Sequence, residues 1–160
     1  MKRNIARTTL LIAVAALCMS SAPAVQAAEH CSNAKAAGKW ALTLTGTLIL
    51  PTGPVPGAAT ASATVDANGN IVSGTEARNV GGDFAYETLT GSWTVNPDCT
   101  GTLTVYAYEN GQLVRTSVLA IVFVDDLRKV RMVQESLTLP NGTPIPVVIT
   151  ADGNRLFPED

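Results

Sequence analysis

The sequence has few of the residues on which most catalytic and metal-binding sites depend. It contains one histidine, His30, and three cysteines, and only 5% of its residues are aromatic. No cluster of His, Cys, Asp or Glu has the spacing of a metal site, and no Ser–His–Asp set can be assembled around His30. No glycine-rich loop precedes a helix in a way that would cradle a phosphate. We therefore predict no catalytic residues, no bound metal and no cofactor.

Long hydrophobic runs are scarce as well. The one candidate, residues 10–19, has half of the roughly 20 apolar residues that a transmembrane helix needs. It follows a basic start and precedes a stretch of small residues, in which Val25 and Ala27 fit the positions before a cleavage site. This order predicts a secretory signal peptide over residues 1–27. The mature chain would begin at residue 28 and be exported, to the periplasm or the outside of the cell.

The sequence also has no excess of positive charge. It contains 13 acidic and 11 basic residues, and three of the basic ones, Lys2, Arg3 and Arg7, lie in the predicted signal peptide. Their removal takes the formal net charge from −2 to −5. An acidic chain without a basic stripe argues against nucleic acid and anionic membranes as partners. Nothing in the sequence indicates an oligomeric state.

Two cysteines would remain after export, because Cys18 lies in the signal peptide. Cys31 and Cys99 would then meet an oxidising compartment, where a pair of thiols commonly forms a disulfide. The two do not form a C-x-x-C pair, which argues against redox chemistry. We predict a structural disulfide that ties the N-terminal segment, residues 28–38, to the turn at residues 96–99.

The rest of the sequence alternates between apolar and polar residues, a pattern typical of β-strands, and lacks a long helical period. Asn-Gly and Gly-Gly pairs separate many of the runs and predict tight hairpins. We expect an antiparallel up-and-down barrel of eight strands over residues 39–151, with a two-sheet β-sandwich as the alternative. The tail, residues 152–160, has no strand pattern. The predicted strands cover residues 39–50, 59–66, 71–79, 83–95, 100–109, 112–124, 127–139 and 145–151.

Two motifs resemble a family of small secreted bacterial proteins. Residues 66–75 read DANGNIVSGT and residues 89–102 read LTGSWTVNPDCTGT. The family repeats a D-G-N-x-x-G hairpin and a G-x-[YW]-x-V-x-x-D-C-T-G hairpin. Its members are generally described as uncharacterised, and a calycin-like or allene-oxide-cyclase-like barrel is suggested for them. The resemblance implies a fold and no catalytic residue, since no catalytic residue of the plant cyclases matches a motif here.

Pairing rules single out one group of charged residues. A two-residue turn at Gly-Gly would place Glu76 directly opposite Glu87, and a bulge near Cys99 would bring Glu87 onto one face with neighbouring apolar residues. If the later hairpins also have two-residue turns, strand pairing puts Arg131 and Glu135 on that face. These four residues, if inside the barrel, would orient the polar end of a ligand. A turn longer by one residue would instead point Glu76 to solvent, and the pattern leaves open which face is inside.

We favour an exported, non-enzymatic barrel that binds a small apolar or amphipathic molecule. One alternative is an isomerase- or cyclase-like enzyme that uses Glu87 with Arg131 or Glu135. Another is a packed barrel that acts through its outer surface. In that case the partner patch would consist of Tyr106, Tyr108 and Phe123.

Overall fold

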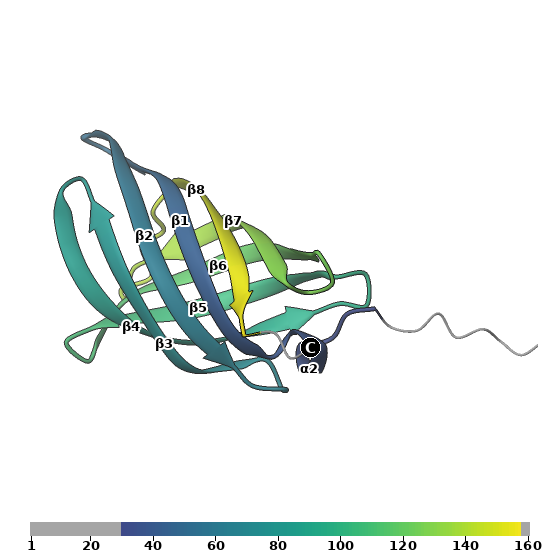
Figure 1. Cartoon of the computed structure of the whole chain (residues 1–160). Helices are drawn as coiled ribbons and strands as arrows, with labels where there is room; N and C mark the ends of the chain where they lie inside the picture. Colours follow the sequence, from purple (N-terminus) through teal and green to yellow (C-terminus); the bar gives the residue numbers. More distant parts are fainter. Residues whose placement is uncertain (1–29, 158–160) are drawn as a thin grey trace, which may run out of the picture.

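The protein is a closed β-barrel of eight antiparallel strands in sequence order, as the computed structural model shows (Figure 1). The structure describes residues 30–157, so the predicted signal peptide lies outside the described residues. Every strand pairs with its neighbours in the chain, and β1 pairs with β8 to close the barrel. The prediction of an up-and-down barrel is confirmed, and a two-sheet sandwich is excluded. The elements are α2 (Asn33–Ala36), β1 (Gly38–Leu50), β2 (Gly53–Val65), β3 (Asn70–Val80), β4 (Asp83–Val95), β5 (Thr100–Glu109), β6 (Gln112–Val124), β7 (Lys129–Thr138) and β8 (Val147–Leu156).

Two strands extend beyond their predicted limits. β2 begins at Gly53 rather than at residue 59, although the added stretch contains Pro54 and Pro56, which cannot donate to a ladder. Over residues 53–56, β2 pairs only with β1, because its pairing with β3 begins at Gly57. The missing proline N–H groups therefore fall on an edge where no partner strand needs them.

The last strand also runs further than the sequence predicts. β8 ends at Leu156 rather than at residue 151, so most of the expected irregular tail is strand. Its Asp, Gly and Asn residues are poor strand formers, but β8 pairs with β1 as far as Leu156, opposite Lys39. Arg155 adds hydrogen bonds from its guanidinium to the carbonyl oxygens of Lys35 and Ala37. Closure of the barrel thus overrides local propensity.

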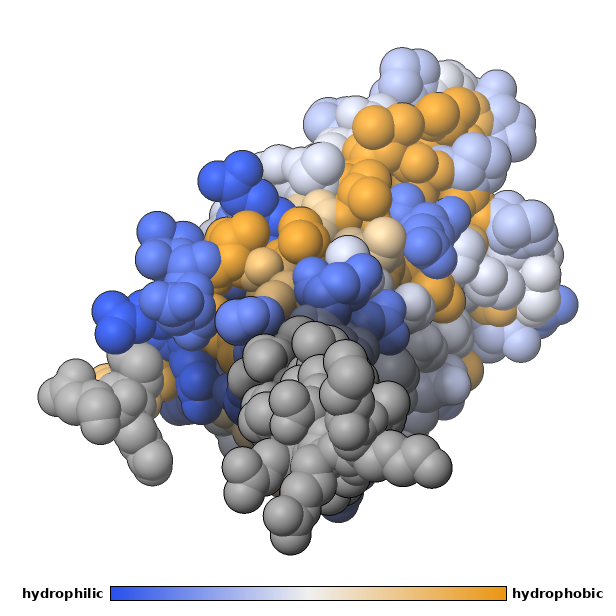
Figure 2. Space-filling model, turned by 90° about the vertical axis from the view of Figure 1, so that its right-hand side faces the viewer, coloured by the Kyte–Doolittle hydropathy of each residue, from blue (hydrophilic) through white to orange (hydrophobic). Residues whose placement is uncertain are grey.

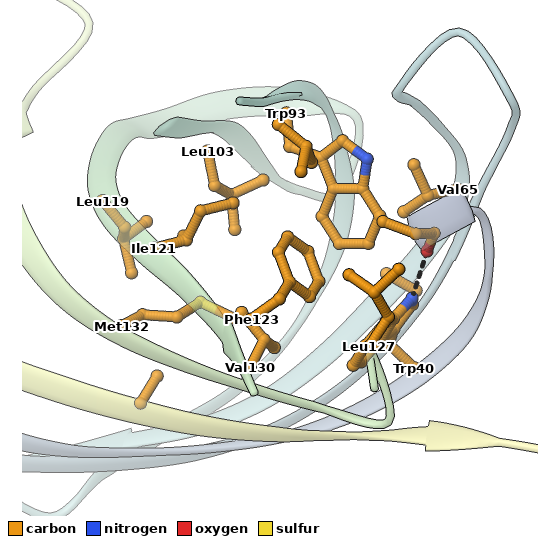
Figure 3. Packing of buried hydrophobic residues seen from close by; sticks show 14 of the residues in the cluster. Trp40, Val65, Trp93, Leu103, Leu119, Ile121, Phe123, Leu127, Val130 and Met132 are labelled. Carbon is orange, nitrogen blue, oxygen red and sulfur yellow. Dashed lines mark hydrogen bonds between the residues drawn. The ribbon is translucent and has the colours of Figure 1, made fainter. Parts of the chain in front are cut away.

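One end of the barrel is plugged by aromatic side chains (Figure 3). Trp40, Trp93 and Phe123 pack edge to face on one another, with ring centroids 5.3–5.7 Å apart. The indole Nε1 of Trp40 donates a hydrogen bond of 3.1 Å to the carbonyl oxygen of Ala36 in α2. We call this end, with the three rings and α2, the plugged end. The opposite end, where the β1–β2, β3–β4 and β5–β6 turns lie, is the open end.

The turns decide which side chains face the interior. Gly81 and Gly82 form the expected two-residue turn, with φ of +62° and +96°, and Glu76 pairs directly with Glu87. Cys99 has φ of +68° at the end of the β4–β5 turn, where the predicted irregularity places Trp93 opposite Leu103. Both register predictions are confirmed.

A bulge between β5 and β6 reverses the expected faces of two later strands. Ala107 pairs with Arg115, whereas Tyr108 pairs with Leu113, so β6 holds one extra residue. A shift of one residue turns every following side chain to the other face. Arg115 consequently points inward. Leu119 and Phe123 also face the interior, whereas Val122 is exposed on the outer face.

The outer surface carries a band of apolar side chains beside polar regions, orange and blue in Figure 2. Val133 of β7 and Val148 of β8, on adjacent strands, are 50% and 64% exposed. The predicted surface patch does not form, because Phe123 lies in the plugged end. Among residues 30–157, no helix is long and apolar enough to cross a membrane.

The predicted disulfide between Cys31 and Cys99 is present and encloses 68 residue steps of chain. It joins the segment before α2 to the β4–β5 turn and so anchors the plugged end. The chain-entropy model assigns a loop of this length about 4 kcal/mol of stabilisation.

Replacement of both cysteines by serine should lower the free energy of unfolding by roughly that amount in urea titrations. The reduced wild-type protein should match the variant, and an unchanged midpoint in both would contradict this role.

Candidate ligand-binding cavity

A cavity of about 430 Å³ occupies the barrel between the plugged end and the open end. Its wall is predominantly apolar, and every strand contributes to it. The β7–β8 connection adds Leu139 and Ile145 close to the open end. Other apolar residues of the wall are Leu42, Leu44, Leu48, Leu50, Ala59, Ala61, Val80, Leu89, Leu103, Val105, Val114, Leu119, Met132, Leu137, Ile149 and Ala151.

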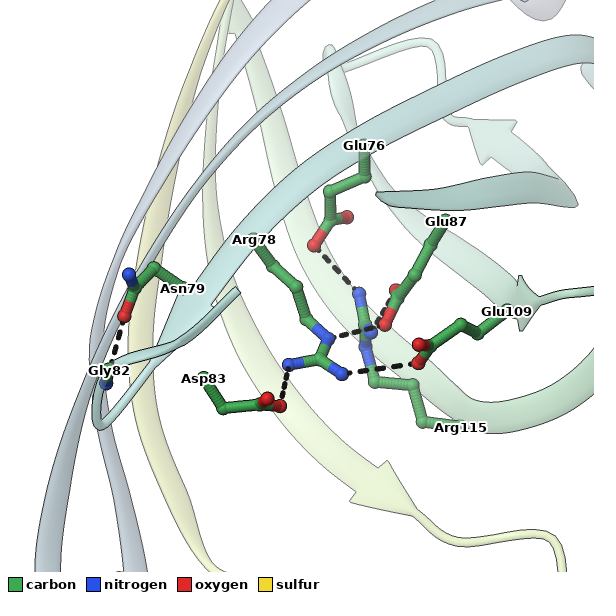
Figure 4. Close-up of polar contacts among 8 residues, drawn as sticks. All are labelled: Glu76, Arg78, Asn79, Gly82, Asp83, Glu87, Glu109 and Arg115. Atoms are coloured by element: carbon green, nitrogen blue, oxygen red, sulfur yellow. Dashed lines mark hydrogen bonds and ion pairs between the residues drawn. The ribbon is translucent and has the colours of Figure 1, made fainter. Parts of the chain in front are cut away.

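Two buried glutamates lie side by side on this wall. Glu76 of β3 and Glu87 of β4 are 6% and 3% exposed, and their pairing holds them directly across from each other. Arg115 of β6 reaches between them. Its Nη2 donates to Glu76 Oε1 at 2.8 Å, and its Nη1 donates to Glu87 Oε2 (Figure 4). One guanidinium therefore bridges two like charges that would otherwise repel.

A second guanidinium completes the cluster toward the open end. Arg78 Nε donates to Glu87 Oε1 at 2.5 Å, Nη1 to Asp83 Oδ2 at 3.1 Å, and Nη2 to Glu109 Oε2 at 3.4 Å. The side chain of Asp83 is 77% exposed and that of Glu109 is 37% exposed, so both lie at the rim. We call these four residues, together with Glu76 and Arg115, the charged cluster.

The local sequence explains why these side chains converge. Arg78 follows Glu76 by two residues on β3, and Asp83 precedes Glu87 by four on β4, so each pair shares a face. The Gly-Gly turn brings the two strands into register at this point. Arg115 joins only because the β5–β6 bulge turns it inward.

Burial has an electrostatic consequence for Glu76. Loss of hydration raises the pKa of this carboxyl, and the nearby charge of Glu87 raises it further, whereas the Arg115 guanidinium opposes both effects. Desolvation dominates. The uncharged form of Glu76 is thus easier to populate than that of an exposed glutamate.

A smaller polar group lies on another part of the wall. Gln134 Nε2 donates to Ser117 Oγ at 3.1 Å and to the carbonyl oxygen of Ser136 at 3.0 Å. Gln134 and Ser117 are both buried, and both line the cavity. The cavity therefore contains two separate polar positions within an apolar wall.

Two of the four residues that the sequence singled out belong to the charged cluster. Glu76 and Glu87 come together as expected, but Arg131 and Glu135 are exposed on the outside of β7, so their expected common face with Glu87 was wrong. Arg131 pairs with Val122, which the β5–β6 bulge turns outward, and Glu135 lies at a second bulge between β6 and β7. Sequence reasoning missed Arg78, although its spacing from Glu76 was a usable signal. It also missed Arg115, which no local signal marks.

No group of three or more His, Cys, Asp or Glu side chains among residues 30–157 is placed to hold a metal ion. His30 is exposed at the start of the described chain.

Comparisons with known proteins show neither a family nor a function for this chain. No protein-family model and no curated protein sequence matches the chain. Among solved structures, the chain is similar to the S-type phycobiliprotein lyase CPES from Guillardia theta. The TM-score is 0.39 and the identity is 11%, over 86% of this chain and 100% of that one. A likeness of this degree does not extend to function.

A direct comparison is possible between Arg115, which the structure places between the two glutamates, and Arg131, which the sequence singled out. Arg115→Leu would leave Glu76 and Glu87 opposed in the interior without the cation between them, and should cost about 3 kcal/mol of unfolding free energy. Arg131→Leu changes the same charge on the exposed face and should stay within about 0.5 kcal/mol of wild type. Urea unfolding of both variants at neutral pH measures the difference. Equal losses would show that Arg115 does not hold the carboxylates together.

The raised pKa of Glu76 predicts a pH dependence of stability. Between the ordinary glutamate pKa, about 4.3, and the raised value, the folded state binds more protons than the unfolded state. The contribution of Glu76 is therefore present below the ordinary pKa and is lost as pH rises through the raised one. Glu76→Gln removes this titration, so wild type should lose stability relative to the variant as pH increases.

The exposed Glu135→Gln variant serves as the control, since it removes the same charge from the outer face. Urea titrations at a series of pH values give the three curves. A Glu76→Gln curve parallel to wild type would contradict the burial effect.

Proposed function

We propose that the protein is an exported, non-enzymatic carrier or receptor that binds a small amphipathic molecule inside the barrel. The observation that carries this proposal is the apolar cavity of about 430 Å³ with a buried charged cluster on one wall. Pockets that bind small molecules commonly have volumes of about 300–1,000 Å³, apolar walls and a few convergent polar groups. Both features are present together here.

The apolar wall supports binding of a hydrocarbon portion. Each Å² of apolar surface removed from water contributes roughly 25 cal/mol, so a ligand that fills the cavity gains most of its free energy there. The cavity floor includes Leu103, Leu119 and Met132, which belong to the same buried cluster as the three rings, and the disulfide fixes the plugged end. A preformed floor reduces the ordering that binding would otherwise require.

The disulfide is compatible with export, since such bonds persist in oxidising compartments. The proposal of an exported protein combines this bond with the signal-like sequence at residues 1–27, which lie outside the described chain. Both the periplasm and the extracellular space are oxidising compartments in which the disulfide would persist.

An enzymatic function has one supporting observation, the raised pKa of Glu76 beside the cavity. An enzyme of this kind would need a second chemical group, besides the Glu76 carboxyl, to act on a substrate. Glu87 has both carboxylate oxygens bonded to arginine. The partners expected from the sequence, Arg131 and Glu135, lie on the outer face. Binding without chemistry therefore accounts for the arrangement better.

Two tryptophan substitutions test whether the cavity is the binding site. Ala59 lines the cavity on β2, and Ala59→Trp would fill part of its volume. Ala77 on β3 lies outside the cavity lining, between the inward residues Glu76 and Arg78, so Ala77→Trp adds the same side chain away from the cavity. A neutral fluorescent probe, N-phenyl-1-naphthylamine, should bind wild type and Ala77→Trp with increased emission. Ala59→Trp should bind it at least about tenfold more weakly.

Probe titration followed by fluorescence gives the three affinities. Failure of wild type to bind the probe, or equal losses in both variants, would refute a binding site in the cavity.

A further inference from the structure

The arginines of the charged cluster are already paired with the protein's own carboxylates. All three guanidinium nitrogens of Arg78 donate to carboxylates, and both terminal nitrogens of Arg115 do so as well (Figure 4). Charge-assisted bonds of this kind are among the strongest hydrogen bonds in proteins. An incoming carboxylate would compete with the protein's own carboxylates for these guanidinium groups.

The charges of the cluster also disfavour an anion. Two guanidinium groups face four carboxyl groups, Glu76, Glu87, Asp83 and Glu109. With every carboxyl ionised, this set carries two more negative than positive charges. In a partly dehydrated cavity such an excess repels a ligand carboxylate and attracts a cation or a hydrogen-bond donor.

One oxygen of the two buried glutamates has no hydrogen-bond partner within the described chain. Glu76 accepts through Oε1 from Arg115, whereas no hydrogen bond among residues 30–157 reaches its Oε2. Glu76 lines the cavity although its side chain is only 6% exposed. By contrast, Glu87 uses both of its oxygens. This oxygen lies in an apolar cavity, where a hydrogen bond is electrostatically stronger than in water, so a donor placed here gains more than it would at the surface.

We infer that the polar end of the ligand is a hydrogen-bond donor, a hydroxyl or a protonated amine, and that Glu76 Oε2 accepts it. The inference rests on the proposed function and specifies the class of ligand for the same cavity. The charged cluster disfavours amphiphiles with a carboxylate head, such as fatty acids. The apolar wall takes the chain, and Glu76 fixes the head.

Three amphiphiles of equal chain length provide the test: decylamine, 1-decanol and decanoate. Each displaces N-phenyl-1-naphthylamine from the wild-type mature protein at neutral pH, low ionic strength and concentrations below micelle formation. Decylamine and decanol should displace the probe at concentrations at least about tenfold lower than decanoate does. The amine and alcohol arms show which of the two donors is preferred.

Two matched charge-neutralising variants assign the effect to one residue. Glu76→Gln keeps the shape of the side chain but removes its charge, so the advantage of decylamine over decanoate should shrink by roughly tenfold. Glu135→Gln removes the same charge from the outer face and should keep the wild-type ranking. Thermal unfolding checks that both variants are folded, and the wild-type ranking tests the head-group class without either variant.

The outcomes separate this inference from the proposed function. If wild type does not bind the fluorescent probe, the binding function itself fails. If the probe binds but decanoate displaces it as well as decylamine and decanol do, the function stands and the head-group inference is overturned. An unchanged ranking in folded Glu76→Gln overturns the role of Glu76.

Discussion

The bridge that Arg115 makes between Glu76 and Glu87 is the interaction on which the interior of this barrel depends. The Gly-Gly turn fixes two carboxylates opposite each other in a nearly solvent-free position. Directly opposed like charges destabilise a strand pair, and buried ones do so more strongly. This register is therefore tolerable only if a cation lies between them. The bulge in β6 supplies that cation, since it turns Arg115 inward. One hairpin turn and one extra residue, distant in sequence, act together to make a single electrostatic unit.

The two ends of the barrel divide the tasks of stability and binding. At the plugged end, three aromatic rings pack together, α2 caps Trp40, and a disulfide ties the N-terminal segment to the β4–β5 turn. Toward the open end, the wall remains apolar but unfilled. A cavity in a core costs free energy because its lining lacks contacts. Dense packing and a covalent bond at one end offset that cost, so the other end can remain hollow.

The sequence was sufficient for features set by local chemistry. Alternating residues, Asn-Gly and Gly-Gly turns and two exportable cysteines correctly predicted the barrel, the Glu76–Glu87 pair and the disulfide. It was insufficient wherever one residue of register mattered. The bulge next to Ala107 has no glycine or proline to mark it, yet it moves Arg115 inside and keeps Arg131 outside. The extent of β8 was likewise set by its partner β1, which a local pattern does not reveal.

The charged cluster is better explained by recognition than by stability. A buried ion pair commonly contributes little net stability, because dehydration of both ions offsets their attraction, and apolar replacements of similar size are often as stable. Apolar residues at these positions would also pack more easily against the surrounding leucines and alanines. What they would not supply is a fixed acceptor in an otherwise apolar wall. Arg115 and Arg78 hold Glu87 on both oxygens and Glu76 on one, which leaves one oriented oxygen of this buried pair for a ligand. The arrangement gives up the stability of a filled core and keeps one polar contact with a defined direction, which is what a site that orients one end of an amphiphile requires.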